Sequence, residues 1–567
     1  MAHRPARGLS GWSLAAALVL GVCVPAAAQH HDRPDGRVLD ADPRAATGPI
    51  APLLEGLGSL HHPITTASPR AQTFFDQGLR LAYGFNHQEA LRSFKEAARL
   101  DPQAAMAYWG WAWVLGPNLN LAMQEDAAPQ VAEAMRLAIA RRDGASARER
   151  DYIDALATRY AGGEAPADRG PLDAAYAEAM GRLHRAYPDD LDAATLYAES
   201  LMLLSPWDYF TGDGRPRDWT GEILKTLEEV ARRDPAHTGA LHLYTHAVEA
   251  VEPGRGEAAA DRLRGLAPGA GHLVHMPSHI YMQTGRYREA YESNALAVKA
   301  DEGYITQCRA QGIYPLAYYP HNIHFLVWAA IQQGRSAEAI DAARKVASRV
   351  PEDRGGDAWG LYQAFLGMPI NTLARFGRWD EILQEPAPPG DAPFLAGLRH
   401  YARGLAFTHT GRPKEARREL DRLEALAADP GATRSPVGFS DAARLLDIAR
   451  EALRGEIEAK AGRFDAAIAR LDRAARLEDG LLYNEPPDWF LPVRHTLGAV
   501  LLEAGRPAEA EVVYWRDLEK RPENGFALHG LRLSLEAQGK ADEAARVLER
   551  LRAAWAGADV RLTSSRF

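Results

Sequence analysis

Histidine is concentrated in one part of this chain, with spacings that suit metal binding. Eight of the 19 histidines fall between residues 237 and 324. Two pairs are four residues apart, which places both imidazoles of a pair on one face of a helix, and a third pair is three residues apart. Two imidazoles, with or without a carboxylate such as Glu249, can hold one metal ion. The six candidate ligands are His242, His246, His275, His279, His321 and His324.

The donor types limit the metal without choosing it. Imidazole suits Zn, Cu and Fe, whereas a chain with 2 cysteines offers little for a thiolate site. The run from His242 to His246 has the spacing of the zinc peptidases, but Leu243 stands where their general-base glutamate would be. The alternative is that these histidines line a groove or make hydrogen bonds in a core. Phosphate-loop, nucleophile-elbow and paired-cysteine motifs do not occur in the sequence.

The elements that carry these histidines are predicted to be helix hairpins. A Gly-Arg-x-x-Glu-Ala pattern recurs, each time between apolar residues at helical spacing. The glycine is expected to end one helix in a left-handed cap, and the acidic residue to lie in the first turn of the next helix. Pro277, between two of the histidines, is expected to start or kink a helix. The pattern begins at Gly285, Gly334, Gly411 and Gly505, with variants at Gly377, Gly462 and Gly539.

The register of these hairpins resembles that of the tetratricopeptide repeat (TPR) superfamily, in particular its exported bacterial members. Counting from Ala90, Gly78 lies twelve residues before, Phe94 four after and Pro102 twelve after. The last two pattern alanines are 34 residues apart, which is the TPR period. The resemblance implies an all-α, right-handed solenoid of roughly ten to twelve repeats over residues 70–556, with a concave face that binds a protein or peptide partner.

Four residues are candidates for partner binding in that groove. His87 and Trp109 lie in early repeats, and Asn118 and Asn120 follow within a Gly-Pro-Asn-Leu-Asn run. The amides can bond a peptide backbone, although asparagine in such a run also supports the turn itself. The aromatic insertion over 205–221 lengthens one hairpin connection and could cover the groove. Residues 483–489 open a late hairpin with two carboxylates and two aromatics, which could form part of a ligand wall. For both segments the alternative is packing on a neighbouring repeat.

Composition and segment order set the remaining expectations. The formal net charge is −9 and no Lys/Arg-rich run occurs, so nucleic-acid binding is not expected. Residues 12–24 form a short apolar stretch that ends near three alanines, which is typical of a cleaved export signal, and no later stretch is long enough for a transmembrane segment. The expected parts are a signal peptide over 1–28, a flexible lead-in over 29–69, TPR arrays over 70–383 and 394–556, and a tail over 557–567.

These observations favour an exported protein, periplasmic or secreted. The leading hypothesis is a periplasmic TPR scaffold that binds a protein or peptide in its concave groove, with a histidine-lined metal site. The alternative is a metal-dependent enzyme or metal carrier built on the same solenoid. The difference is testable, because a pure binder survives removal of metal and a metalloprotein loses its ion when the histidine pairs are changed.

Overall fold

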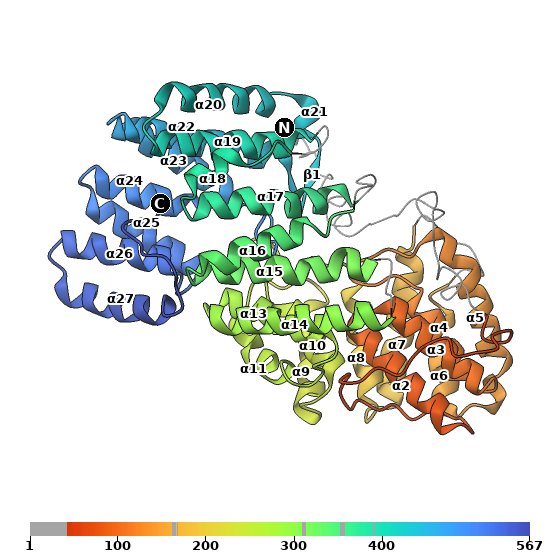
Figure 1. Cartoon of the computed structure of the whole chain (residues 1–567). Coiled ribbons are helices and arrows are strands. Elements are labelled where there is room, and N and C mark those ends of the chain that lie inside the picture. Colours follow the sequence, from red (N-terminus) through yellow and green to blue (C-terminus); the bar gives the residue numbers. More distant parts are fainter. Residues whose placement is uncertain (1–41, 161–165, 167, 309–312, 352–357, 389–391) are drawn as a thin grey trace, which may run out of the picture. The chain divides into compact units, whose positions relative to one another are not determined.

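The computed structural model describes residues 42–160, 166, 168–308, 313–351, 358–388 and 392–567 (Figure 1). The chain divides into two compact units, residues 1–247 and 248–567. The expected signal peptide over 1–28 lies outside the described residues. The proline-rich segment near 384–393, expected to separate two arrays, lies within the second unit.

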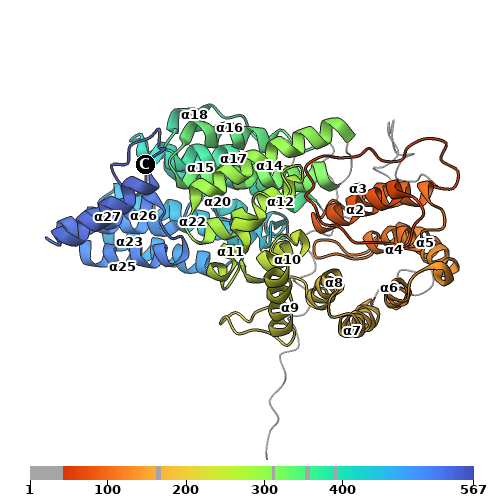
Figure 2. The same cartoon turned by 90° about the horizontal axis from the view of Figure 1, so that it is seen from below.

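The first unit consists of helices, and from α2 to α9 each packs on the next along the chain. Figure 2 shows α6, α7 and α8 following one another in this way. The helices are α2 (Pro69–Tyr83), α3 (His87–Leu100), α4 (Ala105–Val114), α5 (Ala128–Ala140), α6 (Ala147–Ala157), α7 (Gly170–Ala186), α8 (Leu191–Met202), α9 (Thr220–Arg233) and α10 (Thr238–Val248), with single turns η2 (Glu125–Ala127) and η3 (Arg142–Gly144).

The second unit continues with α11 (Pro253–Leu263), α12 (Gly271–His275), α13 (Pro277–Gln283), α14 (Tyr287–Cys308), the π-helical turn η4 (Tyr314–Tyr318), α15 (Tyr319–Gln332), α16 (Ser336–Ala347), α17 (Trp359–Arg375), α18 (Trp379–Gln384), α19 (Pro393–His409), α20 (Pro413–Ala427), α21 (Pro430–Thr433), α22 (Ala442–Lys460), α23 (Phe464–Asp479), α24 (Val493–Glu503), α25 (Pro507–Lys520), α26 (Gly525–Ala537) and α27 (Ala541–Ala554). A two-residue antiparallel pair, β1 (Pro436–Val437) and β2 (Ser440–Asp441), precedes α22.

The predicted hairpin turns are confirmed at all seven glycines of the recurring pattern. Each has a positive φ, between 62° at Gly377 and 78° at Gly285. Glycine populates this region without the steric cost that a Cβ brings. After Gly285, the Arg286 amide donates to Tyr281 O at 2.8 Å, which closes the helix in a Schellman motif. The all-α class and the repeat of TPR-like hairpins are therefore confirmed.

Small residues let the two helices of a hairpin approach closely, as the repeat register requires. A Cβ placed on Gly78 would lie 2.7 Å from the Phe94 ring, and one on Gly498 would lie 2.4 Å from the Tyr514 ring. Both distances are too short for carbon atoms in contact. The aromatic residue of the second helix thus fills the space that glycine leaves on the first.

Part of the segment expected as a flexible lead-in packs on the first repeat. The Ile50 amide donates to Glu96 Oε2 at 2.8 Å, and the Leu54 amide donates to Gln77 Oε1 at 2.8 Å. Ile50 is 3% exposed. No sustained hydrophobic period in residues 29–69 predicts this packing, which combines backbone hydrogen bonds with a few isolated buried side chains such as Ile50.

The tail after α27 folds back onto the second unit. Asp559 accepts hydrogen bonds from the Ser336 amide at 2.7 Å and the Ala337 amide at 2.9 Å. These amides open α16, whose own preceding residue supplies no side-chain cap. The tail therefore acts as the N-cap of a helix far away in the sequence.

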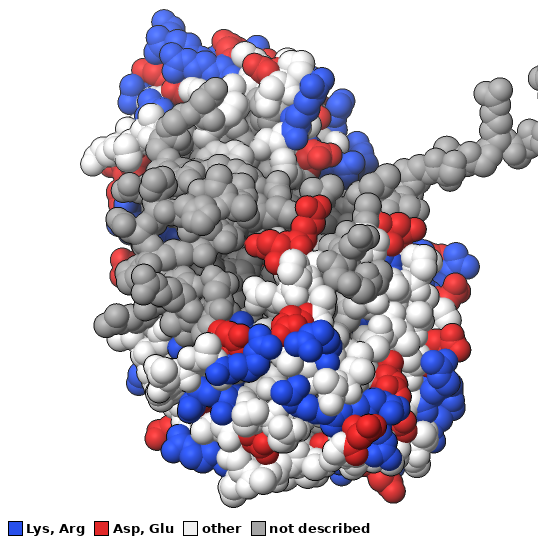
Figure 3. Space-filling model, turned by 90° about the vertical axis from the view of Figure 1, so that its right-hand side faces the viewer, with Lys and Arg blue, Asp and Glu red and all other residues white. Residues whose placement is uncertain are grey.

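The surface is of mixed charge on the face shown in Figure 3, where Lys and Arg are interspersed with Asp and Glu. Within the described ranges, none of the helices has both the length and the apolar character needed to cross a bilayer.

Candidate metal centre

A broken helix in the second unit brings two of the predicted ligands together. α12 ends at His275 and α13 starts at Pro277, as expected from the missing amide hydrogen of proline. His279 follows on α13. The Nε2 atoms of His275 and His279 lie 3.0 Å apart, and the side chains are buried. The two rings, four residues apart, thus still face each other although the helix is interrupted between them.

The ring of His275 is oriented by Asn294 of α14. The Nδ1 atom of His275 lies 2.7 Å from Asn294 Oδ1. The amide nitrogen of Asn294 donates to Ala290 O at 2.7 Å, which fixes the oxygen toward the imidazole. Since Asn294 Oδ1 only accepts, Nδ1 of His275 carries a proton, and its Nε2 lone pair points at His279.

The ring of His279 is held by two carboxylates. Its Nδ1 atom lies 2.8 Å from Glu249 Oε2 and 2.9 Å from Glu485 Oε2. Glu249 directly follows α10, and Glu485 comes from the connection between α23 and α24, where Gln283 Nε2 donates to it. Burial alone would lower the pKa of His279, but the two carboxylates outweigh it and raise that pKa to about 10. Carboxylates behind an imidazole are a common outer shell of metal-binding histidines.

His321, in the first turn of α15, completes a group of three. Its ring centroid lies 4.9 Å from that of His275 and 5.8 Å from that of His279. One ring nitrogen from each of the three histidines falls within 4.8 Å of the others. His321 is only half-buried, whereas the other two rings are buried. The Phe325 ring lies 4.5 to 4.9 Å from all three. The group therefore has an apolar wall and one partly open side.

His324, also a predicted ligand, packs elsewhere. Its ring stacks on Phe490 at 5.1 Å, and its Nε2 lies 3.2 Å from Met368 Sδ. Burial lowers its pKa to about 3, so the ring is neutral. The structure therefore groups His321, but not His324, with His275 and His279.

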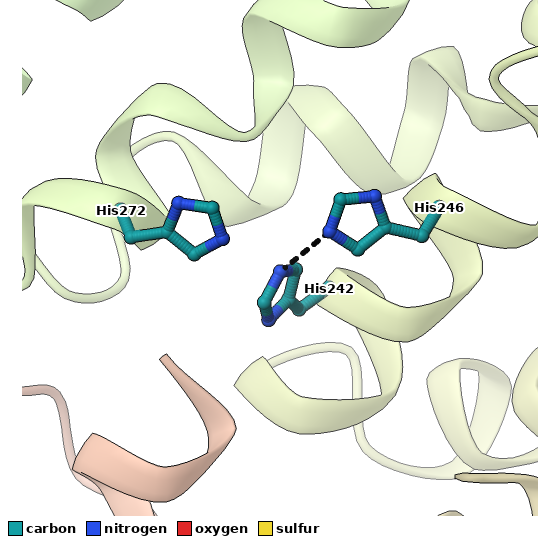
Figure 4. Close-up of side chains that lie close together, drawn as sticks. All are labelled: His242, His246 and His272. Atoms are coloured by element: carbon teal, nitrogen blue, oxygen red, sulfur yellow. Dashed lines mark hydrogen bonds between the residues drawn. The ribbon is translucent and has the colours of Figure 1, made fainter. Parts of the chain in front are cut away.

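The other predicted pair, His242 and His246, lies on α10 of the first unit. Figure 4 shows their rings pointing toward each other, with Nε2 atoms 3.1 Å apart. The Nδ1 atom of His242 lies 2.5 Å from the backbone oxygen of Tyr83. A carbonyl only accepts, so this ring too presents its Nε2 lone pair to its partner.

Two residues with left-handed backbones face this pair. Phe85 has φ 57°, and its ring lies 4.3 Å from His242 and 5.7 Å from His246. Trp207, from the predicted aromatic insertion, has φ 64° and meets His246 edge-on at 4.9 Å. Such a backbone is costly for a large residue and concentrates at functional sites. The insertion thus reaches the histidine pair, and the Trp207 indole donates to Leu119 O at 2.8 Å.

The four residues expected to bind a partner have structural contacts in this unit. The His87 Nδ1 atom lies 3.1 Å from Phe85 O. Trp109 is 2% exposed, and its indole donates to Tyr152 O at 3.2 Å. Asn118 Oδ1 accepts the amides of Asn120 and Leu121 at 3.0 Å each, so it supports its own turn. Trp109 therefore belongs to the core, and Asn118 fits the turn alternative.

Comparisons with known proteins add only distant similarity. No protein-family model matches the sequence, and no curated protein is similar to it in sequence. Among solved structures, the chain is similar to the human IFIT1 dimer with m7Gppp-AAAA at 14% identity, covering 86% of this chain and 90% of that one with a TM-score of 0.29. A similar match is to the APC/C hetero-tetramer Cut9-Hcn1, at 14% identity, covering 86% and 78% of the two chains with a TM-score of 0.29. These values are too low to transfer a function, so the interpretation rests on the residues of this chain.

Proposed function

We propose that this protein binds a transition-metal ion on a TPR scaffold, with His275, His279 and His321 as ligands. One observation carries the proposal. The Nε2 atoms of His275 and His279 lie 3.0 Å apart, while oxygen atoms face the Nδ1 atom of each ring. Outer partners therefore direct both inner nitrogens to one point.

Two imidazole lone pairs that face each other at this distance need something between them. A proton on one ring satisfies both nitrogens, and so does a metal ion. With metal–nitrogen bonds of about 2.0–2.1 Å and tetrahedral angles, two ligand nitrogens lie roughly 3.3–3.4 Å apart. The observed separation of 3.0 Å is slightly shorter, and small ring rotations would open it enough for an ion. A shared proton needs only the two facing nitrogens. The third ring, His321, offers a further ligand, which a metal ion would use and a proton would not.

Three protein ligands leave a coordination position for water or a substrate, as in catalytic zinc sites. The half-buried His321 side gives access from solvent. The nitrogen donors suit Zn, Cu or Fe. The proposal thus favours the metalloprotein alternative, an enzyme or a carrier, over a scaffold whose histidines are structural. The His242–His246 pair offers a second place for an ion by the same geometry.

The test is metal analysis of the full chain, without an affinity tag of histidines and without chelator. We compare His275→Ala and His279→Ala with the matched control His324→Ala, which removes a buried ring packed on Phe490. At least one equivalent of metal should be lost in the first two variants and kept in the control. Equal metal content in all three folded variants would reject the site. Metal-free protein after growth in metal-rich medium would reject the proposal as a whole.

Hairpin repeats serve in general as scaffolds for protein interaction. A protein or peptide partner in the concave groove, and export to the periplasm, remain part of this proposal. Crosslinking in the source cells tests for the partner, and cell fractionation tests for export. Recovery of the protein only from the cytoplasmic fraction, at its full unprocessed mass, would contradict export.

A further inference from the structure

The lead-in segment of residues 50–67 lies on the first unit without forming a helix or a strand. Its other side chains are exposed or half-buried, and the buried ones are those of Ile50, Ala51, Leu57 and His62. Most of its hydrogen bonds to the repeats join polar side chains of the helices to its own main chain. A bound peptide is held in this way, whereas an element of a core makes its contacts mainly through side chains.

A row of polar side chains on α2 binds alternate residues of this segment. The contacts are Arg80 Nε to Leu60 O at 2.6 Å, the His62 amide to Asp76 Oδ1 at 3.1 Å and the Ile64 amide to Gln72 Oε1 at 2.9 Å. The helix residues are four apart and the segment residues two apart. Four residues of an α-helix rise by about 6.0 Å and two residues of an extended chain by about 6.4–6.8 Å, so the two spacings match. The segment therefore runs extended and antiparallel to α2, and the helix recognises its main chain.

Two glutamines of α2 each bind both an amide and a carbonyl of the segment. Gln72, which accepts the Ile64 amide, also donates through Nε2 to His62 O at 2.8 Å. Gln77 accepts the Leu54 amide at Oε1 at 2.8 Å and donates through Nε2 to Pro52 O at 2.9 Å. Bonds to the main chain do not depend on the side chains of the segment, so another polypeptide in the same conformation can form them.

One side-chain pocket adds selectivity to this main-chain recognition. His62 is 4% exposed, and its Nδ1 atom lies 2.8 Å from Asp192 Oδ2. The Tyr152 ring meets the His62 ring edge-on at 5.5 Å, and the Phe75 ring lies at 6.1 Å. Burial alone would lower the pKa of His62, but the hydrogen bond to Asp192 and the charge of that carboxylate outweigh burial and raise the pKa. An aromatic pocket with a carboxylate in it therefore suits an imidazole that carries a positive charge.

We infer that residues 50–67 are a tethered occupant of a peptide-binding face of the first unit, and that this face binds an extended segment of a partner protein with a histidine in the Asp192 pocket. The lead-in shows the chemistry that fits, namely amides and carbonyls at alternate positions and one imidazole. Because a tethered ligand has an effective concentration on the order of millimolar, a partner must displace it. The inference rests on the part of the proposed function that concerns a peptide partner, and it uses none of the proposed metal ligands.

Two other interpretations make different predictions. If the lead-in is a permanent part of the fold, the same residues supplied as a separate peptide do not bind. If the face is instead filled by the lead-in of a second copy of this chain, the wild-type protein is a dimer. A tethered occupant predicts a monomer that binds the separate peptide once its own lead-in is released.

The experiment measures the fluorescence anisotropy of a fluorescein-labelled peptide of residues 48–68 titrated with the full chain. His62→Ala combined with Ile64→Pro releases the lead-in, because the double variant lacks the pocket side chain and one amide that Gln72 accepts. Glu55→Ala is the matched control, because Glu55 is an exposed residue of the same segment. Amide hydrogen exchange of the lead-in reports its release. A chelator in every sample keeps the result independent of the metal centre, which metal analysis tests separately.

We expect the double variant to bind the peptide roughly tenfold or more tightly than the wild type and Glu55→Ala do. Adding Gln72→Ala to the double variant should weaken binding roughly fivefold or more, and so should His62→Ala in the peptide. A folded double variant with a rapidly exchanging lead-in that binds no better than the wild type would overturn the inference. Continued protection of the lead-in in the double variant would also overturn it, because the segment is then part of the fold. A wild-type dimer in sedimentation velocity would do the same, because a second copy is then the occupant.

Discussion

The orientation of His275 by Asn294 makes a prediction that separates a metal site from a merely buried histidine pair. Asn294→Ala removes the oxygen that lies 2.7 Å from His275 Nδ1 without touching any proposed ligand. The ring can then turn or take the other tautomer. Loss of such an outer partner typically weakens metal binding 10–100-fold, which is about 1.4–2.7 kcal/mol.

The assay is a competition titration of Zn²⁺ against a chromophoric chelator at constant pH. The variant also loses a buried amide, which costs about 1–3 kcal/mol of folding free energy, so the control must carry a similar loss. Gln333→Ala supplies it, because Gln333 is buried in the same unit and donates to Tyr287 O at 3.0 Å and Ala329 O at 3.1 Å. Circular dichroism at the assay temperature confirms that both variants are folded.

We expect Asn294→Ala to bind zinc 10–100-fold more weakly than Gln333→Ala, which should match the wild type. A wild-type zinc affinity in both variants would show that Asn294 does not orient a ligand. An equal weakening in both would show that general stability, rather than the outer shell, controls binding. Either result refutes the geometric argument.

Further predictions address the carboxylates, pH and the tail. Glu249→Gln and Glu485→Gln should each weaken zinc binding less than the double variant does, since both oxygens face one nitrogen; a double variant no weaker than the singles by competition titration would contradict this. Burial lowers the pKa of His495 from 6.5 to about 4, so the unfolded chain binds a proton first as pH falls. As the pH falls between those two pKa values, the free energy of unfolding should decrease by about 1.4 kcal/mol per pH unit. Urea unfolding at a series of pH values should show this contribution in the wild type and not in His495→Gln. The same pH dependence of the unfolding free energy in both proteins would be evidence against it. Asp559→Ala should lower the free energy of unfolding by about 0.5–2 kcal/mol and Asp559→Asn by less, and equal urea midpoints for the two would reject the capping role.

The repeating parts of the fold were predictable because a local pattern specifies them. Glycine followed by a basic residue marks seven of the hairpin turns, and the positive φ at Gly285 and Gly539 follows from that pattern. The tail and the lead-in were not predictable, since Asp559 and Ile50 act through hydrogen bonds to distant backbone or side-chain groups. Irregular segments carry no period from which such contacts can be inferred.

The candidate centre was predictable only within one helix turn. The spacing of four residues correctly paired His275 with His279 and His242 with His246. The outer residue Asn294 lies on another helix, where a lone asparagine in a helical pattern gives no signal. Glu485 belongs to an insertion noted for its two carboxylates and two aromatics, but its target could not be read from the sequence. For His324, the three-residue spacing is equally compatible with a place beside His321 and with the observed packing on another face.

Because these imidazole rings are buried, the stability of the histidine-rich repeats depends on what lies between the two inner nitrogens of each pair. His242 and His275 are fully buried. A buried imidazole is tolerated when both of its nitrogens have partners. In each pair the outer nitrogen of the first ring has an oxygen partner, and the inner nitrogens face each other at 3.1 and 3.0 Å. Two neutral rings with their protons on the outer nitrogens would repel there, so the pairs are stable only with a shared proton or a shared metal ion. Metal binding must then displace a proton, and the affinity of the site depends on how strongly the outer oxygens hold each ring in the orientation that the ion requires.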